Sequence, residues 1–172
     1  MIRTQLTVNE AELTDRLLPL VEGRVFHVSL LSNLPAILTA GAIQPNIDGT
    51  FDTTFGYSTN SYFRNRGCVS IFDWRTPPPD ENYVYRCWPF PREVHGLAIF
   101  ILSPAAYTDL LPWTRWKSDE ALGEMIAPYV EAGYKGAIPL ALIDEVIEVV
   151  VQETSDPCRA ALLNGRKRNA AP

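Results

Sequence analysis

Apolar positions near the start of the chain recur at the spacing of a helix. Leucine and valine residues repeat every three or four positions over residues 10–21, which predicts an amphipathic helix that ends at Gly23. Asn9 and Glu12 precede this stripe at the spacing of a capping box. Three shorter helical segments are expected: one capped by Ser32 or Asn33 and closed by Gly41, one from Ser118 or Asp119 to Ile126, and a single turn over Pro139–Ile143.

Other apolar positions form short continuous runs, the pattern of strands buried on both faces. The four runs are Val25–Leu30, Cys68–Trp74, Leu97–Leu102 and Val146–Val151. Two irregular stretches separate them: a polar connection over residues 44–66 and a Pro-rich, aromatic excursion over residues 76–93. No glycine-rich turn of the GxGxxG or GxxxxGK type follows a strand, so neither a Rossmann domain nor a P-loop enzyme is expected.

Length and composition predict one domain. The chain has 172 residues, of which 47% are hydrophobic, enough for one good-sized core. We expect a single domain over residues 1–165 and a basic tail over residues 166–172. No run of about 18 apolar residues and no basic leader followed by an apolar stretch occurs, which favours a cytoplasmic protein without a membrane span.

Charge and cysteine usage restrict the function classes. The net charge of −5 disfavours a broad grip on nucleic-acid phosphates, although a local basic groove is compatible with it. Three widely spaced cysteines, Cys68, Cys87 and Cys158, are interpreted as reduced thiols rather than a disulfide framework. Two isolated histidines and scattered thiols do not approach the spacing of zinc ligands, so no metal is expected.

Two titratable residues stand out by position. His27 lies within an apolar strand directly before a short helix, and the alternative is a core histidine with both nitrogens satisfied. Glu131 precedes a turn at Gly133 and Gly136, where it could end a strand facing a cleft; the alternative is a solvated glutamate.

The loop over residues 55–66 combines hydroxyls, amides, aromatic rings and arginines ahead of a strand. Arg64 and Arg66 are suited to phosphates, which arginine binds bidentately, and Tyr57 and Tyr62 are suited to stacking on a planar base. The mixture favours a nucleotide ligand, and an ordinary polar loop is the alternative.

Residues 25–29, with His27 on a strand, and 33–41, an Asn-Leu-Pro helix that ends in glycine, together resemble the opening of the DarT-like ADP-ribosyltransferases. Tyr62-Phe63 followed by Arg66 is a weaker match. Glu131, with the Ile-Pro-Leu segment and the valine-rich strand that follow it, resembles the closing part of that family, which carries its catalytic glutamate.

The resemblance implies an α+β fold with split β-sheets, splayed apart around NAD and flanked by short helices. It implies that Glu131 and His27 are catalytic, Glu131 by holding the ribose 2′-hydroxyl and stabilising the oxocarbenium ion. It also implies the NAD-binding residues, which are His27, Ser29, Asn33, Tyr57, Tyr62, Arg64 and Arg66. The activity would be transfer of ADP-ribose from NAD to DNA, RNA or protein, in a toxin or defence component with a cognate antitoxin.

Three alternatives remain open. Glu124 competes with Glu131 as the catalytic carboxylate. The chain could be an inactive nucleotide-binding module that keeps the crevice. It could also be a protein-interaction domain whose contact surface is the Pro-rich, Trp-containing segment 76–116.

Overall fold

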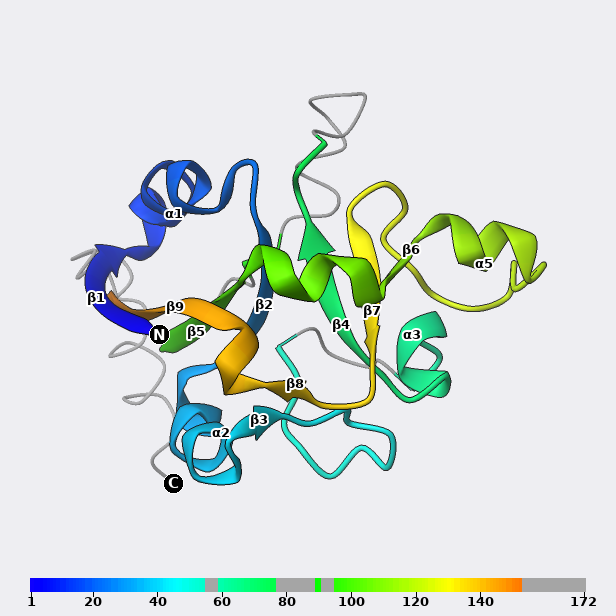
Figure 1. Ribbon diagram of the computed structural model, residues 1–172. Helices are drawn as coiled ribbons and strands as arrows, with labels where there is room; N and C mark the ends of the chain where they lie inside the picture. The colour runs from blue at the N-terminus through cyan, green and yellow to red at the C-terminus, as the bar shows by residue number, and fades with distance from the viewer. Residues whose placement is uncertain (55–58, 77–88, 91–94, 153–172) are drawn as a thin grey trace, which may run out of the picture.

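The computed structural model describes residues 1–54, 59–76, 89–90 and 95–152, which form one seven-stranded mixed sheet in the order β1-β9-β5-β2-β4-β7-β6 (Figure 1). Its strands are β1 (Ile2–Asn9), β2 (Val25–Leu30), β4 (Cys68–Asp73), β5 (Gly96–Leu102), β6 (Leu110–Pro112), β7 (Glu131–Lys135) and β9 (Ile143–Gln152). A small second sheet pairs β3 (Ala42–Ile43) with β8 (Ile138–Pro139). β1 runs parallel to β9, and every other pairing between these strands is antiparallel.

The described helices are short, and the architecture is the mixed α+β class expected from the sequence. They are α1 (Leu13–Val21), α2 (Leu34–Ala40), α3 (Tyr62–Asn65) and α5 (Thr114–Ser118), with 3₁₀ turns η1 (Glu10–Glu12), η2 (Leu31–Asn33), η3 (Pro104–Asp109) and η4 (Leu140–Leu142). In the part of the chain described, no helix has the length and hydropathy needed to cross a bilayer.

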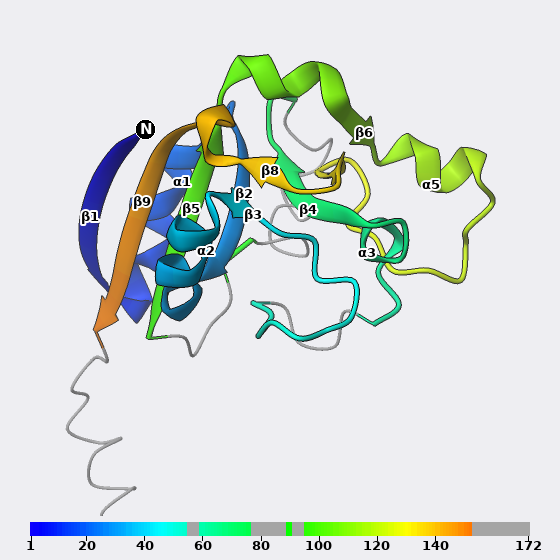
Figure 2. The same cartoon turned by 60° about the horizontal axis from the view of Figure 1, so that its bottom comes forward.

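Both faces of the sheet are covered, which explains the continuous apolar runs. α1 packs Leu13, Leu17 and Val21 onto one face, and α2 with the β3-β8 sheet covers the other (Figure 2). β5 lies between these layers, and all seven of its residues are buried. A strand buried on both sides needs apolar side chains in both directions, so it reads as a run rather than an alternation.

The sheet divides between β2 and β4. These two strands pair only at Val25 with Asp73 and at Phe26 with Phe72, whereas each keeps five register pairs with its other neighbour. Beyond Phe26 the strands diverge, so β1-β9-β5-β2 and β4-β7-β6 form two halves joined at one end (Figure 1). The expected pair of separate small sheets is thus one sheet that is split over part of its length.

The predicted strands and three of the four predicted helical segments, including the single turn at residues 139–143, are confirmed to within a few residues, and two local expectations are wrong. The Asn9 side chain makes no capping bond, and residues 10–12 form a 3₁₀ turn before α1. No helix runs from Asp119 to Ile126: α5 ends at Ser118, and Glu120 takes a left-handed φ of 52° that stops it. Strand β1 was not expected at all.

Several expectations concern residues that the structure does not describe. These are the NAD-binding role of Tyr57, nearly all of the Pro-rich stretch 76–93, the thiols of Cys87 and Cys158, and the tail 166–172. Cys68 is described, and it is a buried free thiol.

Candidate functional site

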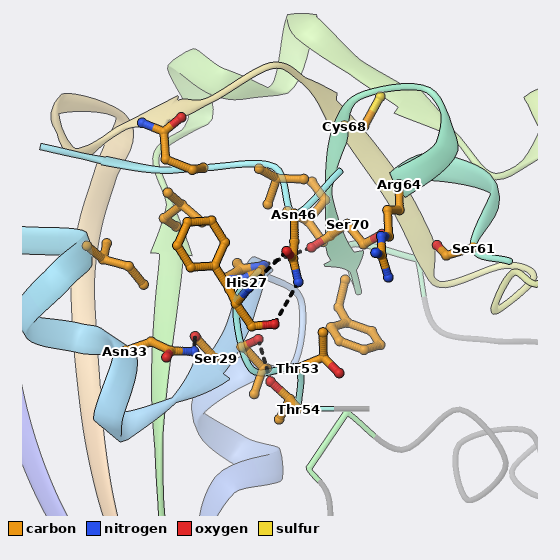
Figure 3. A pocket seen from close by; sticks show the side chains of 18 of the residues that line it. His27, Ser29, Asn33, Asn46, Thr53, Thr54, Ser61, Arg64, Cys68 and Ser70 are labelled. Carbon is orange, nitrogen blue, oxygen red and sulfur yellow. Dashed lines mark hydrogen bonds between the residues drawn. The ribbon is translucent and has the colours of Figure 1, made fainter. Parts of the chain in front are cut away.

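A pocket of about 510 Å³ lies where β2 and β4 diverge. Its walls come from β2, α2, β3, the segment that follows β3, Ser61 and Arg64 at α3, most of β4, and residues 125–127 with Glu131. Figure 3 shows His27 near the middle, the Ser29–Asn33 pair on one side and Arg64 with Ser61 on the other. The volume falls within the range of about 300–1,000 Å³ that is usual for small-molecule sites.

The divergence of β2 and β4 leaves a gap in which the His27 side chain is held in one orientation. Side chains alternate along β2, so His27 and Ser29 share the face that α2 covers. The Nδ1 atom of His27 lies 2.8 Å from the backbone carbonyl oxygen of Ser70, across the gap between β2 and β4. A carbonyl can only accept, so Nδ1 carries the proton and donates.

The protonation state of His27 follows from its surroundings. Burial lowers the pKa of His27 below 6.5, and the hydrogen bond to Ser70 opposes that shift with a smaller effect. The ring is therefore neutral at pH 7, with the lone pair of Nε2 as a hydrogen-bond acceptor for a ligand in the pocket.

Glu131 begins β7, on the other half of the sheet, and lines the same pocket. Its Oε2 accepts a hydrogen bond of 2.7 Å from the backbone N–H of Ala127, and its own N–H donates to the Ala127 carbonyl at 2.9 Å. Burial raises the pKa of Glu131 above 4.5, while the Ala127 N–H and the Ser70 side chain oppose the shift. The carboxylate is thus held in one place at the edge of a partly desolvated cavity.

Ser70 links the two candidate residues, and no motif in the sequence singles it out. Its backbone carbonyl accepts from His27, and its side chain interacts with the Glu131 carboxylate. It lies on β4, whose register puts Ser70 opposite Gly133 and therefore diagonal to Glu131. The contact with His27 is made by the backbone carbonyl of Ser70, which every residue type has, so the sequence could not indicate it.

Ser29 and Asn33 form a second polar group on the wall next to α2. The Asn33 side chain donates to Ser29 Oγ at 3.1 Å and to the Asp52 carbonyl at 3.2 Å. Thr54 Oγ1 donates to the Val28 carbonyl at 3.2 Å. These bonds tie the segment after β3 to β2, so this segment forms one side of the pocket.

Arg64 faces the pocket from α3, opposite Ser29 and Asn33 (Figure 3). Its Nη2 donates to the Ile47 carbonyl at 3.4 Å. It also packs on Gly49, where a Cβ atom would lie 2.6 Å from Nη2. Among the described pocket-lining residues Arg64 is the one permanent cation.

The structure places two other expected NAD-binding residues, Tyr62 and Arg66, outside the pocket. Tyr62 is 2% exposed, and its hydroxyl donates to Asp119 Oδ2 at 2.6 Å. Arg66 lies over the Tyr62 ring, 3.7 Å from its centroid, and binds Glu124 through Nη1 and Nη2 at 2.8 and 3.1 Å. None of these residues lines the pocket, so they form a structural network beside it.

Between the two acids that the sequence left open, only Glu131 reaches the pocket. The Arg66 guanidinium, helped by Asn65, lowers the pKa of Glu124 and holds its carboxylate outside the cavity.

Among the described residues no group of three His, Cys, Asp or Glu side chains is arranged to hold a metal ion. No family model matches the chain, and comparisons with the curated proteins and the solved structures also gave no match.

Proposed function

We propose that this protein is an ADP-ribosyltransferase-like enzyme that breaks the bond between nicotinamide and ribose in NAD. The observation that carries the proposal is the convergence of His27 and Glu131, more than a hundred positions apart in the chain, on one pocket at a split in the sheet. The resemblance of residues 25–41 and of the segment from Glu131 onward to DarT-like enzymes supports the same conclusion.

The polar groups of the pocket match the parts of a dinucleotide. A neutral His27 with a free lone pair on Nε2 would accept a hydrogen bond from a ribose hydroxyl. The guanidinium of Arg64 would bind the pyrophosphate, because planar guanidinium groups pair well with phosphate oxygens. Ser29 and Asn33 would contact the ribose side of the ligand from the opposite wall.

Glu131 would supply the main catalytic effect. Loss of nicotinamide builds positive charge on the ribose, and a carboxylate that is already in position stabilises that charge most in the transition state. The N–H of Ala127 and the side chain of Ser70 favour the ionised form of Glu131 and hold it still. The cost of this burial is a pKa above the ordinary value, so activity should rise with pH as the carboxylate ionises.

The test is release of nicotinamide from NAD by the full chain, followed by mass spectrometry. Glu131→Gln keeps an oxygen that can accept from Ala127 but removes the charge, and we expect a loss of about 10²- to 10³-fold, the scale of removing one electrostatic stabiliser. Glu124→Gln is the matched control, since that acid lies outside the pocket, and it should retain most activity. Equal release by the wild type and Glu131→Gln would refute the proposal.

A further inference from the structure

Large apolar side chains are exposed around the mouth of the pocket. Phe51 and Met125 line the pocket and are 49% and 57% exposed, and Ile47, 54% exposed, belongs to the same loop as Phe51. The Asn46 side chain closes this loop by bonding both the N–H and the carbonyl of Phe51. Single exposed apolar residues are ordinary, but several at the opening of one pocket indicate a contact surface.

Among the residues that the structure describes, the charges at the mouth are mainly acidic. Asp48 and Asp52 lie in or next to this loop and are exposed, and neither takes part in an ion pair within the described ranges. The cation of the described lining, Arg64, holds the Ile47 carbonyl and would face the pyrophosphate of NAD. A nucleic-acid acceptor would need further lysine or arginine side chains here for its phosphates.

We infer that the acceptor of ADP-ribose is a polypeptide segment in which lysine or arginine stands among apolar side chains. This rests on the proposed function. The apolar side chains would pack on Phe51, Met125 and Ile47, and the cation would pair with Asp48 or Asp52. Such a surface combines an apolar contact with a charge that selects the partner.

The chemistry balances without a further reagent. The bond between ribose C1′ and the nicotinamide nitrogen breaks, and its electron pair leaves with neutral nicotinamide. A lone pair on a nucleophilic nitrogen or oxygen of the acceptor forms the new bond to C1′, and the acceptor's proton passes to the Glu131 carboxylate or to water.

The experiment offers NAD and four acceptors to the full chain, with attached ADP-ribose measured by mass spectrometry. The acceptors are a peptide pool with arginine or lysine flanked by leucine and phenylalanine, a matched pool with glutamate in place of the cations, and mixed-sequence single-stranded DNA and RNA. We expect the cationic pool to be modified at least ten times faster than the others. Modification of the nucleic acids, or equal rates on the two pools, would overturn the inference.

A charge reversal outside the pocket lining sharpens the test. Asp48→Lys should lower the rate of transfer to the cationic pool by about two- to five-fold, as expected for an exposed charge pair. It should leave unchanged the rate of NAD hydrolysis, in which water accepts the ADP-ribose and nicotinamide is released. Asp15→Lys, on an exposed position of α1 across the sheet, is the matched control and should change neither rate. If both variants changed the rate of transfer equally, the result would contradict the proposal that the acceptor binds at the mouth of the pocket.

Failure of the inference can be told apart from failure of the proposed function. Without acceptor, release of nicotinamide by the wild type tests the enzyme activity alone. Binding of a fluorescent cationic peptide to Glu131→Gln, measured by anisotropy, tests the acceptor surface without turnover. Nicotinamide release together with no peptide binding would reject the polypeptide acceptor and leave the enzyme proposal standing.

Discussion

Gly133 allows β7 to lie against α3, and a single methyl group there should destabilise the fold. A Cβ atom at Gly133 would lie 2.2 Å from Cδ1, 2.7 Å from Cε1 and 2.8 Å from Cγ of Phe63, all inside van der Waals contact. Phe63 has no exposed surface, and its ring packs edge-on against Tyr62 at 4.9 Å. The ring therefore cannot move aside without displacing α3.

The size of the effect follows from two opposing terms. Overpacking a buried site typically costs about 1–3 kcal/mol, and an overlap with three ring atoms belongs near the upper end. Alanine regains about 0.5–1 kcal/mol because glycine is the less favourable residue in a strand. The net loss for Gly133→Ala is about 2 kcal/mol, or roughly 4–8 °C in the unfolding temperature of a chain of this size.

Thermal and urea unfolding followed by circular dichroism measure this loss. Gly123→Ala is the matched control, because nothing lies within 4 Å of its added Cβ, and it should change the free energy of unfolding by less than about 0.5 kcal/mol. Phe63→Leu in the Gly133→Ala background should restore part of the loss, as coupled neighbours do. Equal unfolding temperatures for Gly133→Ala and Gly123→Ala would refute the packing of α3 on β7.

Two further predictions concern the candidate site. The pKa of His27 is lowered below 6.5 in the folded protein, so His27 binds a proton more readily in the unfolded chain. The free energy of unfolding of the wild type should therefore decrease as pH falls below about 6.5, by at most about 1.4 kcal/mol per pH unit. His27→Gln should lack this pH-dependent loss in urea titrations. A parallel pH dependence in both proteins would contradict the buried neutral ring. Ser70→Ala removes a group that lowers the pKa of Glu131, so the acid limb of the pH–rate profile for nicotinamide release should move to higher pH. An unmoved limb would count against that contact.

The strands were predictable where burial on both faces left a run of apolar residues. β1 was missed although Ile2, Leu6 and Val8 alternate with polar residues, which is a strand signal on a half-exposed edge. The helix expected after Ser118 failed because Asp119 does not cap a helix. Its carboxylate instead accepts from Tyr62 and pairs with Arg66, contacts that arise only in the folded chain.

At the candidate site, too, the sequence located a segment, while tertiary contacts determined which of its side chains face the pocket. The sequence indicated the segment that holds Arg64 and Arg66 but not which arginine faces the pocket, because residues two apart on a helix point in different directions. Tyr62 and Arg66, four apart, share a face and turn together toward Asp119 and Glu124. The direction in which each side chain leaves this helical turn thus determines which of Tyr62, Arg64 and Arg66 faces the pocket.

NMR can test whether His27 contacts NAD, because the chain has only two histidines, His27 and His95. With ¹⁵N-labelled histidine, NMR reports the proton on each ring nitrogen, and His27→Gln assigns the signals. We expect a neutral His27 protonated on Nδ1, whose Nε2 resonance shifts when NAD is added while that of His95 does not. A His27 resonance that millimolar NAD leaves unmoved would contradict the claim that this pocket binds NAD.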